Sequence, residues 1–260
     1  MENILPIQRF PAGPRMSRRR VLGAYLAEAR SECLRYLRAP AFILPMTLFS
    51  TVFYLMFGVL INHGEASRYL LASYSAFGII GPGLFGFGVS LAIERDGGLL
   101  TLKRALPMPP GAYLLGKMVM AMIAATVVTV LLLLIGLFLA HVVLSRGQIL
   151  ALLATGTFGV LPFCALGMFV GTLIKGQGAP GLLNLVYLPM AFLSGLWLPL
   201  SMLPRALQQL APLWPSYHLN QLTQAAVGLN RGPLLPHVLV LSGFAAGFLL
   251  LAARRLRRYG

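Results

Sequence analysis

The residues from Gly111 to Met118 come closest to a known catalytic motif. They read Gly-Ala-Tyr-Leu-Leu-Gly-Lys-Met, which nearly fits the phosphate-binding loop of nucleotide hydrolases, Gly-x-x-x-x-Gly-Lys followed by Ser or Thr. The hydroxyl of that last residue binds Mg²⁺, and Met118 has none. Such a loop also follows a β-strand, whereas Pro107, Pro109 and Pro110 precede this segment. The sequence therefore predicts that the chain binds no cofactor and hydrolyses no ATP itself.

No other group of residues predicts a catalytic or metal-binding site. Transporters driven by ion gradients usually carry an ionisable group inside the membrane. Here all acidic residues lie outside the long apolar stretches or at their ends: Glu2, Glu28, Glu32, Glu65, Glu94 and Asp96. The histidines at positions 63, 141, 218 and 237 show no zinc-ligand spacing, and Cys33 and Cys164 form no disulfide framework. These patterns disfavour an ion-coupled pump and an intramembrane enzyme, so a partner would have to supply the energy for transport.

The chain has too little polar surface to coat a soluble core. Of its 260 residues, 58% are hydrophobic and 10% are charged, whereas soluble domains carry roughly 25% charged residues. The net charge of +15 would suggest nucleic-acid binding in a soluble protein, but the basic residues cluster at the ends of apolar segments. The composition predicts an all-α integral membrane protein in contact with membrane lipids and without a nucleic-acid partner.

Six apolar segments are long enough to cross the hydrocarbon core as helices, which takes about 20 residues each. They cover residues 41–61, 70–93, 118–140, 149–174, 180–198 and 234–252. If both termini are cytoplasmic, only four of the 21 basic residues fall outside: Arg68, Arg146, Arg205 and Arg231. This bias follows the positive-inside rule and predicts a multi-pass plasma-membrane protein with both ends in the cytoplasm.

The segment 17–40 allows two interpretations. Ser17 and the three arginines after it look like a twin-arginine export signal, but Glu28 and Glu32 interrupt the apolar stretch that such a signal needs. The alternative is an amphipathic helix on the cytoplasmic surface. Its apolar face would carry residues with a helical period: Leu22, Leu26, Ala29, Cys33 and Leu37. We favour this interfacial helix, which Pro40 would end just before the first span.

The loop after the second span is expected to hold a second short helix. Asp96 is expected to cap it, and Pro107 to end it at about Leu106. Leu99 and Leu102 would lie on one face of this helix. On local grounds alone, an ordinary charged turn with surface leucines explains the loop equally well.

This loop resembles the signature of the ABC-2 type permeases, the membrane subunits of ABC exporters. From Glu94 the loop reads Glu-Arg-Asp-Gly-Gly-Leu-Leu-Thr-Leu-Lys-Arg-Ala-Leu-Pro, and Leu-Gly-Lys ending at Lys117 follows it. A second stretch, from Leu188 to Tyr217, is similar to the family pattern around the fifth span and the outer segment after it. Gly98 stands where the family more often has a small hydroxyl residue, and residues 1–16 look like an unmatched extension.

The resemblance implies a coupling helix in residues 94–106 that docks on a separate ATPase subunit, which would hold the ATP and Mg²⁺. In this contact leucines would be apolar anchors and charged residues would form a rim. The residues concerned are Glu94, Arg95, Leu99, Leu102, Lys103 and Arg104. The interfacial helix 17–40 would be the family's connecting helix, a second contact with the ATPase.

The resemblance also implies a dimer, most simply a homodimer, with one ATPase on each copy. The dimer contact and the conduit would come mainly from spans one, two and five. In span two the residues implied in this packing are Gly78, Gly81, Gly83 and Gly86; as ordinary membrane-helix residues they would have no such role. Two further pairs with GxxxG spacing, Gly167 with Gly171 and Gly243 with Gly247, are expected to be packing seams within the subunit.

The segment 199–218 is too broken by prolines to span the membrane. The resemblance implies that it forms short re-entrant helices that cap the pathway from outside, within a six-span domain of residues 41–260 like that of the type V exporters. Phe192, Leu196 and Trp197 are candidates for an outer gate, although they could equally face lipid.

Together these features favour the permease subunit of an ATP-driven exporter in a bacterial inner membrane. Its cargo would be amphiphilic, such as a drug-like compound, a lipid, or a lipid-linked glycan or peptide. The alternative is a membrane scaffold or biogenesis subunit that transports nothing.

Overall fold

The computed structural model describes residues 17–38, 40–105, 109 and 111–259; for residues 40–46, 101, 104–105 and 256–259 it describes the backbone alone. Every regular element in these ranges is a helix. The α-helices are α1 (Arg18–Leu37), α2 (Pro40–Phe53), α3 (Glu65–Asp96), α4 (Leu99–Ala105), α5 (Ala112–Phe138), α6 (Arg146–Gly159), α7 (Leu161–Gly171), α8 (Ala179–Leu193), α9 (Arg205–Leu210), α10 (Pro215–Ala226) and α11 (Leu235–Tyr259). The shorter or wider turns are the π-helix η1 (Tyr54–Ile61) and the 3-10 helices η2 (Gly176–Gly178), η3 (Leu200–Met202) and η4 (Ala211–Leu213).

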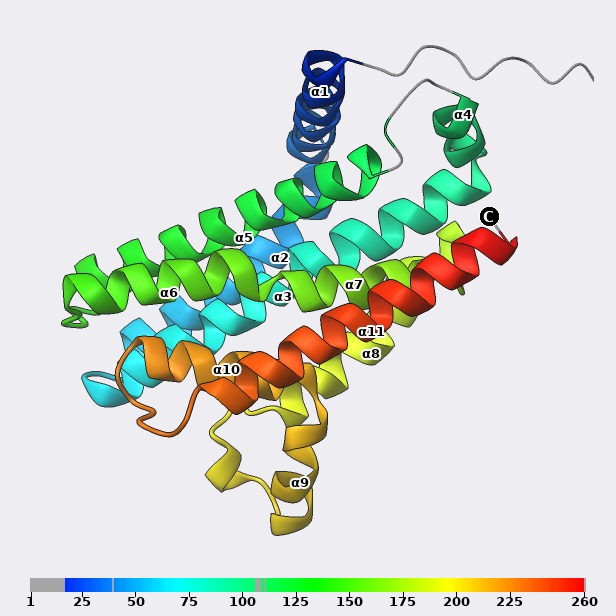
Figure 1. Ribbon diagram of the computed structural model, residues 1–260. Coiled ribbons are helices and arrows are strands. Elements are labelled where there is room, and N and C mark those ends of the chain that lie inside the picture. Colours follow the sequence, from blue (N-terminus) through cyan, green and yellow to red (C-terminus); the bar gives the residue numbers. More distant parts are fainter. Residues whose placement is uncertain (1–16, 39, 106–108, 110, 260) are drawn as a thin grey trace, which may run out of the picture.

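Within the part of the chain that the structure describes, four helices are long and apolar enough to cross a membrane: α3, α5, α6 continued by α7, and α11. They run side by side in Figure 1, whereas α1 (blue) stands steeply to them. The predicted first and fifth spans are helical as α2 with η1 and as α8. The shorter α8 ends at Leu193, and the broken segment with α9 projects from the bundle beyond it (Figure 1).

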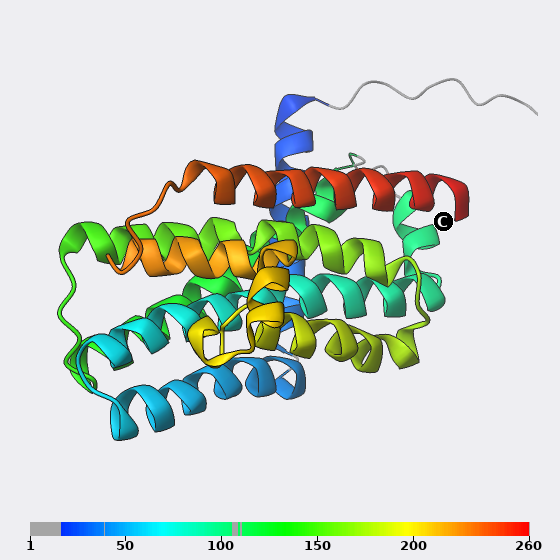
Figure 2. The same ribbon diagram turned by 90° about the horizontal axis from the view of Figure 1, so that it is seen from below.

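Helix α3 lies at the centre of the bundle. In its most apolar window 89% of the residues are buried, against 11% in α11, which lies along the outside against α7 (Figure 2). Glycines allow α3 and α7 to touch through their backbones. A Cβ on Gly171 would lie 2.6 Å from the carbonyl oxygen of Gly88, and one on Gly88 would lie 2.9 Å from that of Gly167. The predicted seam at Gly167 and Gly171 is therefore present within the subunit.

The second predicted seam is wrong. A Cβ added to Gly243 or Gly247 of α11 would meet no atom of the described residues within 4 Å. The spacing of two glycines allows close helix approach, but in α11 the pair faces away from the neighbouring helices.

The short helix after span two also differs from its predicted form. Helix α3 continues through Asp96, and α4 begins only at Leu99, after a turn in which Gly98 has a φ of +73°. This conformation suits glycine, which explains its presence at that position. Asp96 does not cap α4; instead its Oδ2 accepts a hydrogen bond from the backbone N–H of Gly176 at 2.7 Å.

Helix α1 packs against the rest of the protein with its acidic residues. Glu28 and Glu32 are its buried positions, whereas Leu22, Leu26 and Leu37 are each more than 60% exposed. The predicted apolar face is therefore turned away from the described protein, and the polar face contacts α5. Residues 1–16, the predicted extension, lie outside the described residues.

Candidate functional site

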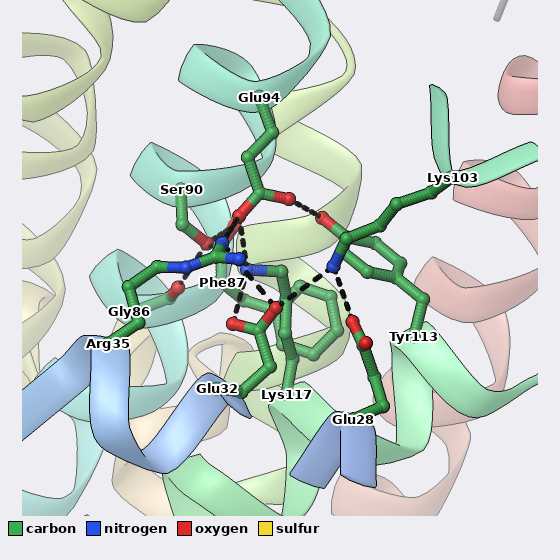
Figure 3. Close-up of polar contacts among 10 residues, drawn as sticks. All are labelled: Glu28, Glu32, Arg35, Gly86, Phe87, Ser90, Glu94, Lys103, Tyr113 and Lys117. Carbon is green, nitrogen blue, oxygen red and sulfur yellow. Dashed lines mark hydrogen bonds and ion pairs between the residues drawn. The ribbon is translucent and has the colours of Figure 1, made fainter. Parts of the chain in front are cut away.

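Six charged side chains meet where α1 crosses the bundle (Figure 3). We call this group the charge cluster; its members are Glu28, Glu32 and Arg35 of α1, Glu94 of α3, Lys103 of α4 and Lys117 of α5. Three are acidic and three are basic, so the cluster carries no net charge at neutral pH. It joins α1 to α3, α4 and α5 through pairs of residues that are 59–85 positions apart in the sequence.

Lys117 is the centre of the charge cluster and is only 1% exposed. Its ammonium group donates to Oε2 of Glu32 at 3.0 Å, to Oε1 of Glu94 at 3.0 Å and to the hydroxyl of Ser90 at 2.8 Å. An ammonium group has three donors, and all three are used. A buried charge is tolerated when it is both paired and fully hydrogen-bonded, and Lys117 meets both conditions.

Glu94 links α3 to α1 and α5. Besides Lys117, it accepts hydrogen bonds from a guanidinium nitrogen of Arg35 and, at 2.6 Å, from the hydroxyl of Tyr113. Both carboxylate oxygens are therefore occupied within the subunit. Because these partners come from α1 and α5, Glu94 fixes the C-terminal end of α3 against both helices.

Lys103 ties α4 to α1. Its ammonium group donates to Glu28 and, at 3.2 Å, to Glu32, and it lies 4.4 Å from the centre of the Tyr113 ring. The side chain is 14% exposed. Since α4 has only seven residues, too few to be stable alone, these contacts help to hold it in place.

Gly116 makes the crossing of α1 over α5 possible. A Cβ at this position would lie 3.0 Å from Cγ of Glu28 and 3.2 Å from the backbone nitrogen of Ala29. A larger residue would push α1 outward and separate Glu28 and Glu32 from the lysines.

The thiol of Cys33 on α1 has a raised pKa, first because of its burial and then because of the neighbouring Glu32 carboxylate.

Arg95 and Asp96 connect the same end of α3 to the opposite side of the bundle. The Arg95 guanidinium donates to the carbonyl oxygens of Gly171 (3.3 Å), Thr172 (2.6 Å) and Ile174 (2.7 Å). These are the free carbonyls at the C-terminal end of α7, where a cation is favourable. With Asp96 bound to Gly176 of η2, just before α8, the last three residues of α3 contact α1, α5, the end of α7 and η2.

Only some of the residues predicted for the ATPase contact are exposed on the surface of the subunit. Leu102 is 65% exposed, and Leu99 is half-buried. Glu94, Arg95 and Lys103 lie nearby, but their charged groups bind within the subunit rather than forming an open rim. The side chain of Arg104 lies outside the described residues.

The predicted gate residues lie together. Leu196 is fully buried, Phe192 is 36% exposed, and the rings of Phe192 and Trp197 meet edge to face with centres 6.4 Å apart. Trp197 also contacts the rings of Phe49 (5.9 Å) and Phe77 (5.7 Å). The gate residues are therefore part of an aromatic group between α2, α3 and the end of α8.

The glycines predicted for dimer and conduit packing are all buried within the subunit: Gly78, Gly81, Gly83 and Gly86. Gly78 lies against Val128 of α5 and Ser50 of α2, and Gly83 against Val160 and the backbone of Cys164. In the described chain these positions serve contacts between helices of one subunit.

The sequence prediction missed most of the charge cluster. It included Glu94 and Lys103 but not Glu28, Glu32, Arg35 or Lys117, and it also missed Tyr113, which donates to Glu94. Two signals were available: Glu28 and Glu32 are four residues apart opposite the leucines of an amphipathic helix, and Lys117 stands unpaired at the start of an apolar span. Lys117 itself lies inside α5, which begins at Ala112.

The charge cluster is suited to joining helices rather than to catalysis. Among the described residues no three His, Cys, Asp or Glu side chains are grouped to hold a metal. Each acid is neutralised by a lysine or arginine, so none is placed to act as a base. The arrangement holds α1, α3, α4 and α5 together.

Comparisons with known proteins agree with this description. The family model described as "ABC-2 type transporter" matches residues 24–227. A protein of Bacillus subtilis (strain 168), named "Putative transport permease YvfS", is 27% identical over 229 residues, which cover 85% of this chain and 92% of that protein.

Proposed function

This chain belongs to the ABC-2 type transporter family, and we propose on that premise that it is the membrane subunit of an ATP-driven exporter. Family membership makes it a transport permease that works with an ABC ATPase subunit. The observation that carries the rest of the proposal is the charge cluster, which ties α4 and α1 to α3 and α5. The ATPase would be a separate chain that binds the ATP and Mg²⁺.

The proposed orientation places α1, α4 and the charge cluster in the cytoplasm. It rests on the basic residues, most of which lie at this end of the spans. Helices α2 and η1 together run from Pro40 to Ile61, about 33 Å at 1.5 Å per residue, enough for one further span. We propose α8 with the broken segment after it as the other, which gives six spans in a bacterial inner membrane.

The ATPase would contact α4 and α1. Leu102 offers an exposed apolar side chain on α4. On α1 a groove of about 650 Å³ is lined by Arg30, Leu34 and Arg38 among others. An acidic and apolar surface of the ATPase would complement both elements.

Movement of the ATPase would reach the spans through the charge cluster. Lys103 couples α4 to α1, Arg35 couples α1 to α3, and Lys117 couples α5 to both. Displacing α4 alone would break the contacts of Lys103 with the largely buried carboxylates of Glu28 and Glu32. The four elements are therefore expected to move together, with Arg95 carrying the motion to α7.

We propose that two copies form the transporter, each with one ATPase. A stripe of exposed apolar residues runs along α2 and η1 at intervals of four residues: Leu48, Val52, Met56 and Leu60. It lies on the first span, which suits a contact with a second copy. The residues buried between the spans are mainly apolar and include several aromatic ones, and with an apolar conduit of this kind we expect an amphiphilic cargo.

The test compares ATP hydrolysis and complex formation in a reconstituted system. A candidate ABC ATPase is combined with the wild-type chain, with Leu102→Asp, or with Val143→Asp. Val143 is 86% exposed in the loop after α5, at the opposite end of the bundle, so it is the matched control. We expect Leu102→Asp, alone or with Leu99→Asp, to abolish the stimulation of ATP hydrolysis, and Val143→Asp to leave it unchanged. If complex formation and turnover both survive the double change, the coupling assignment fails. ATPase binding without any transport by vesicles would favour the scaffold alternative.

A further inference from the structure

Two of the four histidines of the chain lie in contact, although they are 19 positions apart in the sequence. His218 is in the first turn of α10, His237 is in the first turn of α11, and α10 packs against α11 (Figure 1). The Nδ1 atoms of the two imidazoles are 2.8 Å apart, and the ring centres are 5.1 Å apart. Two ring nitrogens from separate helices therefore converge on one point, which the spacing of the histidines does not predict.

A backbone carbonyl fixes the protonation of His218. The Nε2 atom of His218 lies 2.9 Å from the carbonyl oxygen of Pro212 in η4. A carbonyl only accepts hydrogen bonds, so Nε2 carries the proton and Nδ1 of the neutral ring has a free lone pair. In metal sites, a ligating histidine almost always donates its second N–H to a carbonyl, a carboxylate or water. His218 already has this arrangement.

One imidazole of the pair is buried and the other is partly accessible. His218 is 7% exposed, whereas His237 is half-buried. The ring of Tyr217 makes edge contacts with both, its centre 5.3 Å from that of His218 and 6.0 Å from that of His237. Among the residues that the structure describes, no third histidine, cysteine or carboxylate joins the pair. An ion bound here would therefore reach the site past His237 and keep water as its further ligands.

A hydrogen bond and a metal ion would use the same two atoms. Without a metal, the Nδ1–H of His237 donates to Nδ1 of His218 at 2.8 Å. Zinc binds histidine nitrogens at about 2.0–2.1 Å, so two nitrogens on one tetrahedral ion are about 3.3 Å apart. The pair would have to open by about half an ångström, and His237 would have to carry its proton on Nε2. A small rotation of the partly exposed ring provides this opening, because the χ2 torsion of histidine is broad.

We propose that His218 and His237 bind a divalent transition-metal ion such as Zn²⁺ through their Nδ1 atoms, with water in the remaining positions. Imidazole suits Zn²⁺, Cu²⁺ and Ni²⁺, whereas Mg²⁺ and Ca²⁺ prefer oxygen ligands. The ion would clip α10, which follows the broken segment 199–218, to the last helix of the chain. The site shares no residue with the charge cluster and does not depend on the proposed coupling to an ATPase.

The test is a calorimetric titration of the full chain with Zn²⁺ in phosphatidylcholine nanodiscs. The protein is purified through a tag without histidine, and empty nanodiscs give the background. At about pH 7.5 we expect one Zn²⁺ per chain with a Kd of about 1–100 µM, because two ligands supply about half the binding free energy of a four-ligand zinc site. Cu²⁺ should bind more tightly than Zn²⁺, and Mg²⁺ should not bind. At about pH 5.5 the affinity for Zn²⁺ should be at least about tenfold lower, because protons compete for both imidazoles.

The variants separate a metal site from a hydrogen bond. His218→Ala and His237→Ala each remove one ligand and should weaken binding at least about tenfold. His237→Gln can still donate to His218 through its side-chain amide but has no imidazole, so it should remain folded and lose the metal. The matched control is His63→Ala with His141→Ala, which replaces the other two histidines, both exposed, and should leave binding unchanged. Size-exclusion chromatography of each variant checks that it is folded.

Three results would overturn the proposal. The first is uptake of Zn²⁺ no greater than that of empty nanodiscs, which leaves the pair as a hydrogen bond alone. The second is unchanged binding in His237→Gln, which places the metal elsewhere. The third is loss of binding in only one of the two alanine variants, which means that a single imidazole holds the ion. If the buried His218 cannot be replaced without unfolding, the two variants of the half-buried His237 decide the question. No ATPase is present, so the outcome is independent of the coupling test with Leu102→Asp.

Discussion

Replacing Lys117 by methionine is expected to destabilise the protein strongly. The substitution removes the cation that pairs with Glu32 and Glu94 and leaves the charge cluster with one excess negative charge. Removing one partner of a buried ion pair costs about 3–5 kcal/mol. Arg35, Lys103 and Tyr113 still contact the two carboxylates, so we expect a loss near 3 kcal/mol, roughly a hundredfold in the unfolding equilibrium.

The measurement is reversible unfolding in mixed detergent micelles, followed by far-UV circular dichroism. Lys175→Met is the matched control, because Lys175 is exposed and surface substitutions usually change stability by less than about 0.5 kcal/mol. The double variant Lys117→Met with Glu94→Gln restores the charge balance. It should be more stable than the sum of the two single losses predicts, by about 0.5–3 kcal/mol.

Two outcomes would refute this reasoning. If Lys117→Met is as stable as Lys175→Met, the pairs with Lys117 contribute nothing. If the two single losses simply add in the double variant, Lys117 and Glu94 do not act as a pair, and the charge cluster cannot be the link through which α5 follows α3.

Three further predictions concern the packing, the thiols and the orientation. Gly171→Ala should cost about 1–3 kcal/mol by overpacking, because its Cβ would lie 2.6 Å from the Gly88 carbonyl oxygen. Gly243→Ala meets nothing within 4 Å and should be neutral or slightly stabilising in the same unfolding assay. Equal losses in the two variants would contradict the seam between α3 and α7. In a Cys164→Ala variant at pH 7, Cys33 should react with a maleimide more slowly than a free thiol. The reason is that burial and the Glu32 carboxylate raise the pKa of its thiol and so lower its thiolate fraction. A rate equal to that of a free thiol would contradict the raised pKa. In a cysteine-free background, a cysteine at Val143 should be labelled by an impermeant maleimide on intact cells, and labelling only after lysis would reverse the proposed topology.

The helices were predictable because apolar length alone reveals them. The all-helical fold with long apolar spans follows from segments such as 70–93 and 118–140, which the structure extends to α3 and α5. Their ends were less predictable. Glu94 to Asp96 read as the start of a new polar element, but their partners in α1, α5 and the segment after α7 allow α3 to continue through them.

The charge cluster could not be predicted because its pairs are distant in sequence. Glu32 and Lys117 are 85 residues apart, and Arg35 and Glu94 are 59 apart. A periodic pattern identifies the apolar face of a helix but not the element that this face contacts. The pattern of α1 therefore predicts that its leucines pack against the protein, whereas the structure buries its two acidic residues. The same limit applies to the two glycine pairs, which have identical spacing. The pair in α7 packs against α3, whereas the pair in α11 has no atom within 4 Å of an added Cβ.

The order in which the chain is made gives the acids of α1 a second task. Glu32 is synthesised 85 residues before Lys117, an interval of about 4–17 seconds at 5–20 residues per second. During that time its carboxylate lacks Lys117, and that of Glu28 lacks Lys103 of α4. Because an acid is costly inside a bilayer, we expect these two carboxylates to keep the first helix at the surface and to prevent the leucines beside them from drawing it in as a false first span. Once α4 and α5 are made, Glu28 binds Lys103 and Glu32 binds Lys117. The same two acids would therefore direct topology early in biogenesis and close the fold later.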